Sequence, residues 1–287
     1  MLHGTIHPLP LLLLSSSPLL PPHNTNTSLP GYTQSGPLYH AKTRAHEKLL
    51  LKAFPASKVS PLFSLYPGGV QLIYPTAPLK LSPADIPGFV PKEDAPEDNE
   101  PEAYGWWKRE TGGEKYVGLD KGLQTIADAI VQEGGVDGVI GFSQGGCAAG
   151  FVASLLEDGR EASFPESSYP ESFRNLKATI NQAPLKFAVS YSGFAAPNSL
   201  YKHYYEPKIT TPFLHVIGSL DSVVEESRSL ALLDACQEGT GKRVLYHPGG
   251  HFVPIGKEMS GALVGFIREC CEEKKVEEGV EDMDVPF

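Results

Sequence analysis

Short apolar runs alternate with segments of helical periodicity along the chain from about residue 41 onward. Such runs are typical of strands that are buried on both faces of a parallel sheet. The predicted strands are Val70–Tyr74, Gly138–Phe142, Phe187–Tyr191, Phe213–Ile217 and Arg243–Tyr246. The predicted helices are Ala41–Ala53, Leu119–Gln132, Gln144–Leu156, Val223–Cys236 and Ile255–Cys271. This alternation predicts an α/β fold with a mostly parallel central sheet and helices on both of its faces.

Several segments depart from the alternation. Pro91–Glu102 is acidic and contains proline, and Glu157–Ser172 is polar with scattered Pro and Gly, so both are predicted to be surface excursions. Residues 272–287 are predicted to be a flexible acidic tail. The remaining residues, 1–271, are predicted to form one domain, because their number suits a single large α/β core. Within them, residues 5–30 stand out and are considered below.

A Gly-x-Ser-x-Gly motif, Gly141-Phe142-Ser143-Gln144-Gly145, lies between a predicted strand and a predicted helix. A nucleophile at this point requires a tight strand-to-helix turn, and glycine at both flanks removes the collisions that side chains would cause there. The turn also places Ser143 at a helix N-terminus, where backbone N–H groups favour a developing oxyanion. The motif alone could be a simple Gly-rich turn, but its placement between a strand and a helix favours a catalytic serine.

A serine hydroxyl needs a general base, and His251 is the candidate. It lies in a Gly-rich loop after the last predicted strand and before the last predicted helix, where an imidazole can reach over the end of the sheet. The competing histidines His215 and His247 lie within or at the end of strand patterns. We therefore expect them to be core or surface histidines.

Asp221 is the candidate acid, because it follows a predicted strand through the short turn Gly218-Ser219-Leu220. The order serine, acid, histidine is that of the α/β-hydrolases. Asp221 could instead cap the helix predicted from Val223. Asp137, before the nucleophile strand, and Asp234, within a helix, are poorer candidates.

Seven blocks spread over most of the chain resemble the FSH family of serine hydrolases, which includes ovarian-tumour-associated esterases and fungal thioesterases. They are Gly31-Tyr32-Thr33-Gln34-Ser35-Gly36, Tyr74-Pro75-Thr76-Ala77-Pro78, Trp106-Trp107, Gly141 to Gly146, Tyr191-Ser192-Gly193-Phe194, His215-Val216-Ile217-Gly218 with Asp221, and His247-Pro248-Gly249-Gly250-His251. The resemblance implies an α/β-hydrolase fold, a triad of Ser143, Asp221 and His251, and hydrolysis of a carboxylic ester or thioester. It implies no cofactor and no metal.

The region before Gly31 departs from the family pattern, in which a first strand runs directly into a Leu-His-Gly-Tyr turn. Met1-Leu2-His3-Gly4 resembles the first half of this turn and Gly31-Tyr32 the second, so the turn is predicted to be split by residues 5–30. These residues include eight Leu, six Pro and no charged side chain, and they lack helical or strand periodicity. Our hypothesis is that they are translated non-coding sequence; a real lid or membrane-touching loop is the alternative.

The oxyanion donors implied by this turn are backbone N–H groups. We expect them at Gln144 and at Tyr32, with Thr5 taking the place of Tyr32 if the insert keeps the His3-Gly4 turn. Loss of one such donor costs on the order of 10² to 10³ in turnover. A split turn would therefore favour a non-catalytic ligand-binding protein, and an acyltransferase using the same triad is a further alternative.

Charge and cysteine content narrow the possible partners. The formal net charge of −10 disfavours binding to nucleic acid and to anionic membranes. The four cysteines form no CxxC pair or metal-ligand cluster, which favours reduced thiols in a cytoplasmic protein, with the nucleus as a second candidate location. The apolar run at Leu11–Leu14 is too short for a membrane span and lacks the basic flank of a signal peptide. The expected partner is a small ester or thioester, with a carrier-bound acyl chain as one form of it.

Side chains that line the acyl site are harder to assign from sequence. Trp106 and Trp107 are candidates for an acyl-binding wall, although paired aromatic residues in a loop often anchor that loop to the core instead. Phe194 and Phe252 follow predicted strands, and the same two interpretations apply to them.

Overall fold

The computed structural model describes residues 23–56, 65–90, 101–110, 112–166, 168–196, 199–239 and 243–271. The His3-Gly4 turn, Thr5, most of Pro91–Glu102 and the acidic tail 272–287 lie outside the described residues.

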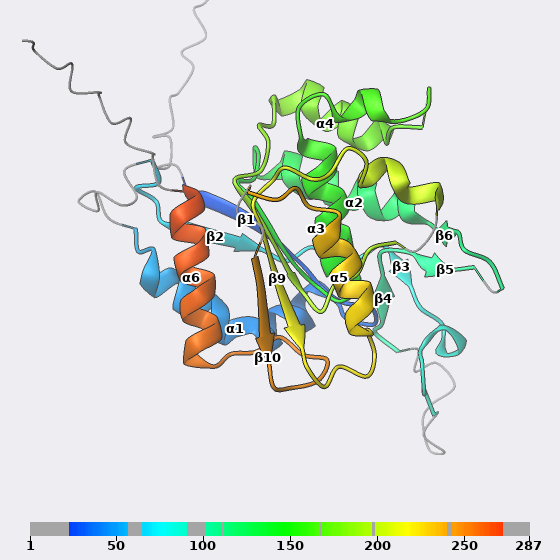
Figure 1. Ribbon diagram of the computed structural model, residues 1–287, viewed down its shortest axis with the longest axis horizontal. Helices are drawn as coiled ribbons and strands as arrows, with labels where there is room; N and C mark the ends of the chain where they lie inside the picture. The colour runs from blue at the N-terminus through cyan, green and yellow to red at the C-terminus, as the bar shows by residue number, and fades with distance from the viewer. Residues whose placement is uncertain are drawn as a thin grey trace, which may run out of the picture.

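A six-stranded parallel sheet forms the centre of the protein (Figure 1). Its strands are β1 (Asn24–Leu29), β2 (Val70–Ile73), β7 (Gly138–Phe142), β8 (Phe187–Tyr191), β9 (Phe213–Gly218) and β10 (Arg243–His247). They lie in the order β10-β9-β8-β7-β1-β2, and each neighbouring pair is parallel. The predicted α/β class and parallel sheet are confirmed, and because all strands are parallel, their carboxyl ends meet at one edge.

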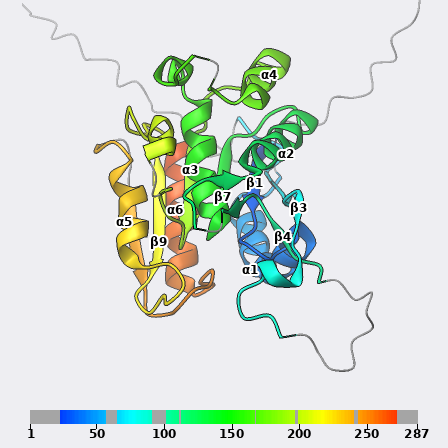
Figure 2. The same cartoon turned by 90° about the vertical axis from the view of Figure 1, so that its right-hand side faces the viewer.

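Helices cover both faces of this sheet (Figures 1 and 2). They are α1 (Gly36–Ala53), α2 (Leu119–Gln132), α3 (Gln144–Leu156), α4 (Glu171–Ile180), α5 (Glu226–Asp234) and α6 (Lys257–Cys271). Helices α1 and α6 lie together on one face, whereas α2, α3 and α5 lie on the other, with α4 beside α2. Two short antiparallel pairs stand at the edge of the domain: β3 (Leu79–Lys80) with β4 (Tyr104–Gly105), and β5 (Lys108–Arg109) with β6 (Tyr116–Val117).

The two faces of the sheet carry separate cores because side chains alternate along each strand. In β7, Val139 packs into the core beneath α2 and α3, whereas Ile140 and Phe142 pack into the core beneath α1 and α6. All five β7 residues are buried. A strand buried on both faces explains the continuous apolar runs of the sequence.

The first strand was not predicted from the sequence, and the hypothesis that residues 5–30 are non-coding sequence outside the working domain is wrong for residues 24–29. Strand β1 lies inside the sheet, where Asn26 is aligned with Leu72 of β2 and with Gly138 of β7. All six residues of β1 are buried although five of them are polar. Its own side chains satisfy part of this polarity, because the Asn26 amide donates to the Asn24 carbonyl and side-chain oxygens at 3.1 and 2.8 Å.

The predicted split of the oxyanion turn is also wrong. Strand β1 ends at Leu29 and continues directly through Pro30 and Gly31 to Tyr32. The family's strand-to-turn order is therefore intact, with Pro30 where the family pattern has histidine.

The other boundaries differ where local chemistry outweighs periodicity. Helix α1 begins five residues before its predicted start, because Ser35 caps it by accepting a hydrogen bond from Leu38 N–H and because proline is tolerated in a first turn. Helix α5 is shorter than predicted and begins at Glu226. Helix α4 was not predicted: it starts within the end of the polar segment 157–172 and buries little more than Phe173 and Leu176.

The polar segment after α3 is not simply a surface excursion, because two of its charged side chains are buried. Glu157 and Arg160 form an ion pair, with exposed fractions of 7% and 2%. Glu157 also accepts hydrogen bonds from Thr210 and Thr211, while Arg160 donates to the Pro207 carbonyl. Buried charges of this kind persist only when they are paired and hydrogen-bonded, as these are.

Among the described residues, no helix combines the length and apolar character that crossing a membrane would require.

Candidate active site

Ser143 occupies a strained turn between β7 and α3. Its backbone adopts φ 53° and ψ −114°, and its N–H is held by the Tyr191 carbonyl at 2.9 Å. The flanking glycines are required by contact, because a Cβ on Gly141 would lie 2.0 Å from the Gly145 carbonyl oxygen, and a Cβ on Gly145 would lie 2.2 Å from the Leu29 carbonyl oxygen. The predicted steric need for glycine at both flanks is confirmed. Strain of this kind is typical of a nucleophile elbow.

Asp221 and His251 form a hydrogen-bonded pair at the carboxyl end of the sheet. The Asp221 Oδ2 lies 2.8 Å from His251 Nδ1. Its other oxygen, Oδ1, accepts hydrogen bonds from the N–H groups of Val223 and Val224 at 2.9 Å each. The sequence offered two roles for Asp221, orienting the imidazole or capping a helix from Val223. The carboxylate contacts His251 and also caps the turn at Val223 and Val224, whereas helix α5 begins only at Glu226.

The environment of Asp221 keeps its carboxylate charged. Burial opposes the charge, but hydrogen bonds from Val224 N–H, His251 and Val223 N–H, with the nearby Ser192 hydroxyl, hold the pKa of Asp221 below its usual range. Hydrogen bonds to the ionised form explain this direction. A charged Asp221 is suited to stabilise an imidazolium at His251.

His251 lies next to the serine elbow, because its ring packs on that of Phe142 with 4.8 Å between centroids. The competing histidines are placed differently. His215 is 2% exposed and stacks on Phe213, and His247 is 3% exposed, with burial lowering its pKa. The carboxylate of Asp221 contacts the ring of His251, and this contact favours His251 as the base.

The Gly31–Tyr32 turn lies against the elbow. A Cβ on Gly31 would be 3.3 Å from the Ser143 Cβ. Within the described part of the chain, neither the Tyr32 N–H nor the Gln144 N–H has a hydrogen-bond partner, whereas the adjacent Thr33 N–H is bound to the Tyr104 carbonyl at 2.8 Å. The sequence predicted these two N–H groups as oxyanion donors, and that role stays a prediction; Thr5, the alternative, is outside the described residues.

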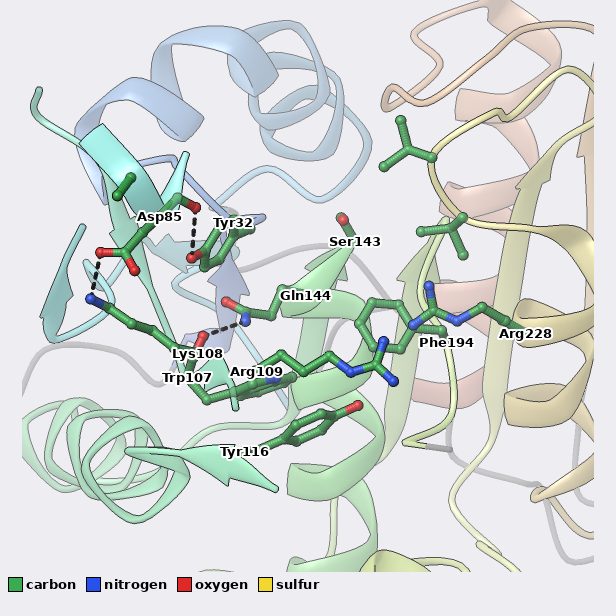
Figure 3. A pocket seen from close by; sticks show the side chains of 13 residues that line it. Tyr32, Asp85, Trp107, Lys108, Arg109, Tyr116, Ser143, Gln144, Phe194 and Arg228 are labelled. Atoms are coloured by element: carbon green, nitrogen blue, oxygen red, sulfur yellow. Dashed lines mark hydrogen bonds and ion pairs between the residues drawn. The ribbon is translucent and has the colours of Figure 1, made fainter. Parts of the chain in front are cut away.

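A pocket of about 430 Å³ opens beside Ser143 (Figure 3). It is lined by Tyr32, Ala84, Asp85, Trp107, Lys108, Arg109, Tyr116, Ser143, Gln144, Phe194, Val223, Val224 and Arg228. The predicted aromatic candidates therefore divide between two roles: Trp107 and Phe194 line this pocket, whereas Trp106 is fully buried and Phe252 packs on the His247 ring. Arg109 and Arg228 also line the pocket but were not predicted from the sequence. The basic pair Lys108-Arg109 after Trp107 was a signal for Arg109, and no motif marks Arg228.

The Gln144 side chain fixes the wall of this pocket. Its amide oxygen accepts a hydrogen bond from Trp106 N–H and its amide nitrogen donates to the Trp107 carbonyl, both at 2.8 Å. The Trp106 indole N–H in turn donates to the Pro30 carbonyl at 3.0 Å. Gln144 thus ties the pocket wall to the elbow through its side chain, and its backbone N–H takes no part in these contacts.

We expect Gln144→Ala to lower the free energy of unfolding by about 2–4 kcal/mol, because two buried backbone groups lose their partners. Urea denaturation measures the change. Gln124→Ala is the matched control, since the Gln124 amide bonds only the exposed Asp128, and it should change stability by less than about 0.5 kcal/mol. Equal stability of the two variants would show that Gln144 does not hold the wall.

Within the described ranges, no group of three or more His, Cys, Asp or Glu side chains is arranged to hold a metal ion. The chemistry that the arrangement offers is nucleophilic, since it brings a strained serine, a carboxylate–imidazole pair and unpaired N–H donors to one sheet edge.

Comparison with known proteins agrees with this geometry. The family model described as serine hydrolase (FSH1) matches residues 24–263, beginning at the first residue of β1. A Saccharomyces cerevisiae protein named family of serine hydrolases 2 is 30% identical over 252 residues, which are 85% of this chain and 94% of that protein. A Schizosaccharomyces pombe protein named dihydrofolate reductase is 30% identical over 240 residues, 79% of this chain but 43% of that protein, so the chain spans less than half of its length.

Among solved structures, acyl-protein thioesterase 2 of Zea mays superposes with a TM-score of 0.55 at 19% identity, covering 89% of this chain and 96% of that one. At this identity the similarity concerns the fold, which is the α/β-hydrolase fold predicted from the sequence.

Proposed function

Because the chain belongs to the FSH1 family of serine hydrolases, we propose that it cleaves a carboxylic ester or thioester with Ser143 as nucleophile, His251 as general base and Asp221 as orienting acid. The observation that carries this proposal is the Asp221–His251 hydrogen bond of 2.8 Å beside the strained Ser143 elbow. A hydroxyl, a base and an orienting carboxylate at one edge are the requirements of serine acyl transfer.

In the proposed first half-reaction, the Ser143 hydroxyl oxygen attacks the substrate carbonyl carbon while His251 takes the hydroxyl proton. Since Nδ1 of His251 is bound to Asp221, Nε2 is the nitrogen left to accept that proton. The tetrahedral intermediate collapses, His251 returns the proton to the leaving oxygen or sulfur, and an acyl-enzyme remains on Ser143.

In the second half-reaction, His251 deprotonates a water molecule that attacks the acyl carbon. Collapse of the second tetrahedral intermediate returns the proton to Ser143 and releases a carboxylic acid. The backbone N–H groups of Gln144 and Tyr32 stabilise the oxyanion in both halves, and each such donor contributes on the order of 10² to 10³ to turnover.

The continuous Pro30–Gly31–Tyr32 turn removes the main reason to consider a non-catalytic binding protein, which was the predicted split of this turn. Transfer of the acyl group to an acceptor other than water would use the same side chains. Product analysis in the presence of a competing alcohol or thiol separates hydrolysis from this acyltransfer.

Labelling with a fluorophosphonate probe tests the proposed nucleophile. We expect the full chain to be labelled at one site, and Ser143→Ala to lose labelling and ester hydrolysis together, because the probe bonds only an activated serine. Ser154→Ala, at a buried serine within α3, is the control and should still be labelled. Labelling that persists in Ser143→Ala would overturn the assignment.

We also propose the substrate and the location expected from the sequence. The substrate is a small ester or thioester, or an acyl chain bound to a carrier, and the enzyme works in the cytoplasm or the nucleus. The four cysteines, all of them free thiols, support a reducing compartment. Probe labelling of fractionated cells tests the location.

A further inference from the structure

The pocket beside Ser143 carries positive charge although the whole chain has a formal net charge of −10. Its lining includes three cationic side chains, Lys108, Arg109 and Arg228, and one anionic side chain, Asp85. A cleft with an excess of one sign of charge concentrates ligands of the opposite sign.

Of these three cations, Lys108 is neutralised by a neighbouring carboxylate. The Lys108 Nζ lies 2.6 Å from Asp85 Oδ2, and this contact, with hydrogen bonds from Ser82, lowers the pKa of Asp85 to about 2. Among the described residues, neither Arg109 nor Arg228 has a carboxylate within ion-pair distance. Two guanidinium groups are therefore left to face the pocket.

Arg228 is held in place at the start of α5. Its guanidinium carbon lies 4.2 Å from the centre of the Phe194 ring, so the ring supports one flat face of the group. Its carbonyl accepts a hydrogen bond from Ala195 N–H at 3.2 Å, and the adjacent Ser229 hydroxyl donates to the Gly193 carbonyl at 2.6 Å. Stacking on a ring leaves the N–H edge of a guanidinium free to bind an anion.

Arg109 reaches the same pocket from the β5–β6 hairpin, where it is paired with Tyr116. The hairpin is anchored because the Tyr116 ring stacks between those of Trp107 and Tyr201, at 4.9 and 4.6 Å. Figure 3 shows the two guanidinium groups directed into the pocket from opposite sides, near Phe194 and Tyr116. The charges of both arginines act on the Tyr116 hydroxyl, favouring its ionised form, although burial is the larger influence and raises its pKa.

Two arginines that point into one pocket offer several guanidinium N–H donors to an anionic group, and such charge-assisted hydrogen bonds to carboxylate or phosphate are strong. Trp107, Tyr116 and Phe194 line the space beside them, so a short apolar chain can lie between Ser143 and the cations. The side of a substrate that enters this pocket therefore needs an apolar stem and a negatively charged group.

We propose that Arg109 and Arg228 form an anion-binding subsite that selects esters or thioesters bearing a carboxylate or phosphate group away from the scissile bond. This inference rests on the proposed function, since it names the substrate class for the Ser143 site. The anion can belong to an acyl chain that ends in a carboxylate, or to a leaving group that bears phosphate.

The test compares matched charged and neutral substrates by kcat/KM. One pair is the 4-nitrophenyl monoester of a short dicarboxylic acid and its methyl-capped neutral counterpart. The other pair is an acyl-coenzyme A and the same acyl group on N-acetylcysteamine. We expect the full chain to prefer the charged member of at least one pair by about 10- to 100-fold, as charge-assisted hydrogen bonds to two guanidinium groups would give. The preferred pair identifies the source of the anion.

Arg109→Gln and Arg228→Gln should each lower the charged-to-neutral ratio about 10-fold, and Arg228→Lys should recover part of it by restoring the charge. Arg243→Gln is the matched control, because Arg243 pairs with Glu269 at the opposite end of the sheet, and its ratio should equal that of wild type. A wild-type ratio near 1 for both pairs, or a ratio unchanged in both glutamine variants, overturns the subsite. Absence of hydrolysis for neutral and charged substrates alike, with no fluorophosphonate labelling, would instead overturn the proposed function.

Discussion

Replacing His251 by alanine should lower kcat by about 10⁵- to 10⁶-fold, because the Ser143 hydroxyl then has no group to accept its proton. The effect should appear in kcat more than in KM, since general-base catalysis acts in the transition state and His251 is not among the residues that line the substrate pocket. Hydrolysis of a 4-nitrophenyl ester, followed by absorbance, measures the loss.

His247→Gln is the control for this experiment. His247 lies four residues before His251, is buried, and its Nε2 has no hydrogen-bond partner within the described residues. The variant should therefore keep kcat within about 10-fold of wild type, provided that circular dichroism shows it to be folded. A loss in His247→Gln equal to that in His251→Ala would mean that the base has been assigned to the wrong histidine.

Asp221→Asn should be less harmful than loss of His251, because the base remains and only its orientation and charge stabilisation are lost. The two Asp221 oxygens separate these contributions. An asparagine keeps one oxygen that can accept from Val223 and Val224 N–H, as Oδ1 does, while an amide in place of Oδ2 can no longer accept from His251 Nδ1. The turn that precedes α5 should therefore survive in a variant that has lost most of its activity.

Much of the sheet could be predicted because its strands are apolar on both faces. The predicted ranges of β7 and β8, and those of α2 and α3, coincide with the structure. The serine, the acid and the histidine were each predicted just after a strand. They lie at one edge of the sheet because the carboxyl ends of parallel strands lie together. Local sequence patterns were sufficient to predict a strand that is apolar on both faces or a turn that requires glycine at both flanks.

Strand β1 could not be recognised in the same way, since its interior position is stabilised by polar contacts that periodicity does not report. The Asn24 amide reaches Cys271 Sγ at 3.5 Å, and the Thr25 N–H donates to the Asp137 carboxylate at 3.1 Å. These partners lie 247 and 112 residues away in the sequence. Buried polar residues are tolerated only with such partners, and no local window contains them.

The lining of the pocket could not be predicted from the sequence either. Arg109 lies in a hairpin and Arg228 in a helix, the two residues are 119 positions apart in the sequence, and neither lies in a recognisable motif. Their convergence depends on where the β5–β6 hairpin and α5 stand around the end of the sheet, which is a property of the tertiary fold. The strained turn at Ser143 was thus predictable from a five-residue motif, whereas the two arginines that line the pocket beside it were not.

Deletion of residues 24–30 should abolish folding, which is the opposite of the result expected if this end of the segment 5–30 were non-coding sequence. If these residues were inserted non-coding sequence, their removal would restore a better enzyme. In the structure they supply β1, which pairs with β2 on one side and β7 on the other through four aligned residue pairs each. Each net backbone hydrogen bond contributes about 0.5–1.5 kcal/mol, so the loss of both ladders approaches or exceeds the total stability of about 5–15 kcal/mol of a typical domain.

The deletion would also remove Leu29 and Pro30, whose carbonyl oxygens lie against the Gly145 backbone, and would leave Tyr32 without the strand that positions it. We therefore expect insoluble protein, or soluble protein without a cooperative thermal transition and without probe labelling. A deletion of the same length from the acidic tail, residues 281–287, serves as the control and should remain folded and labelled, because the sequence predicts that the tail stands apart from the domain. A folded, labelled protein that lacks 24–30 would show that another segment can take the place of β1. That result would also contradict the assignment of Tyr32 as an oxyanion donor.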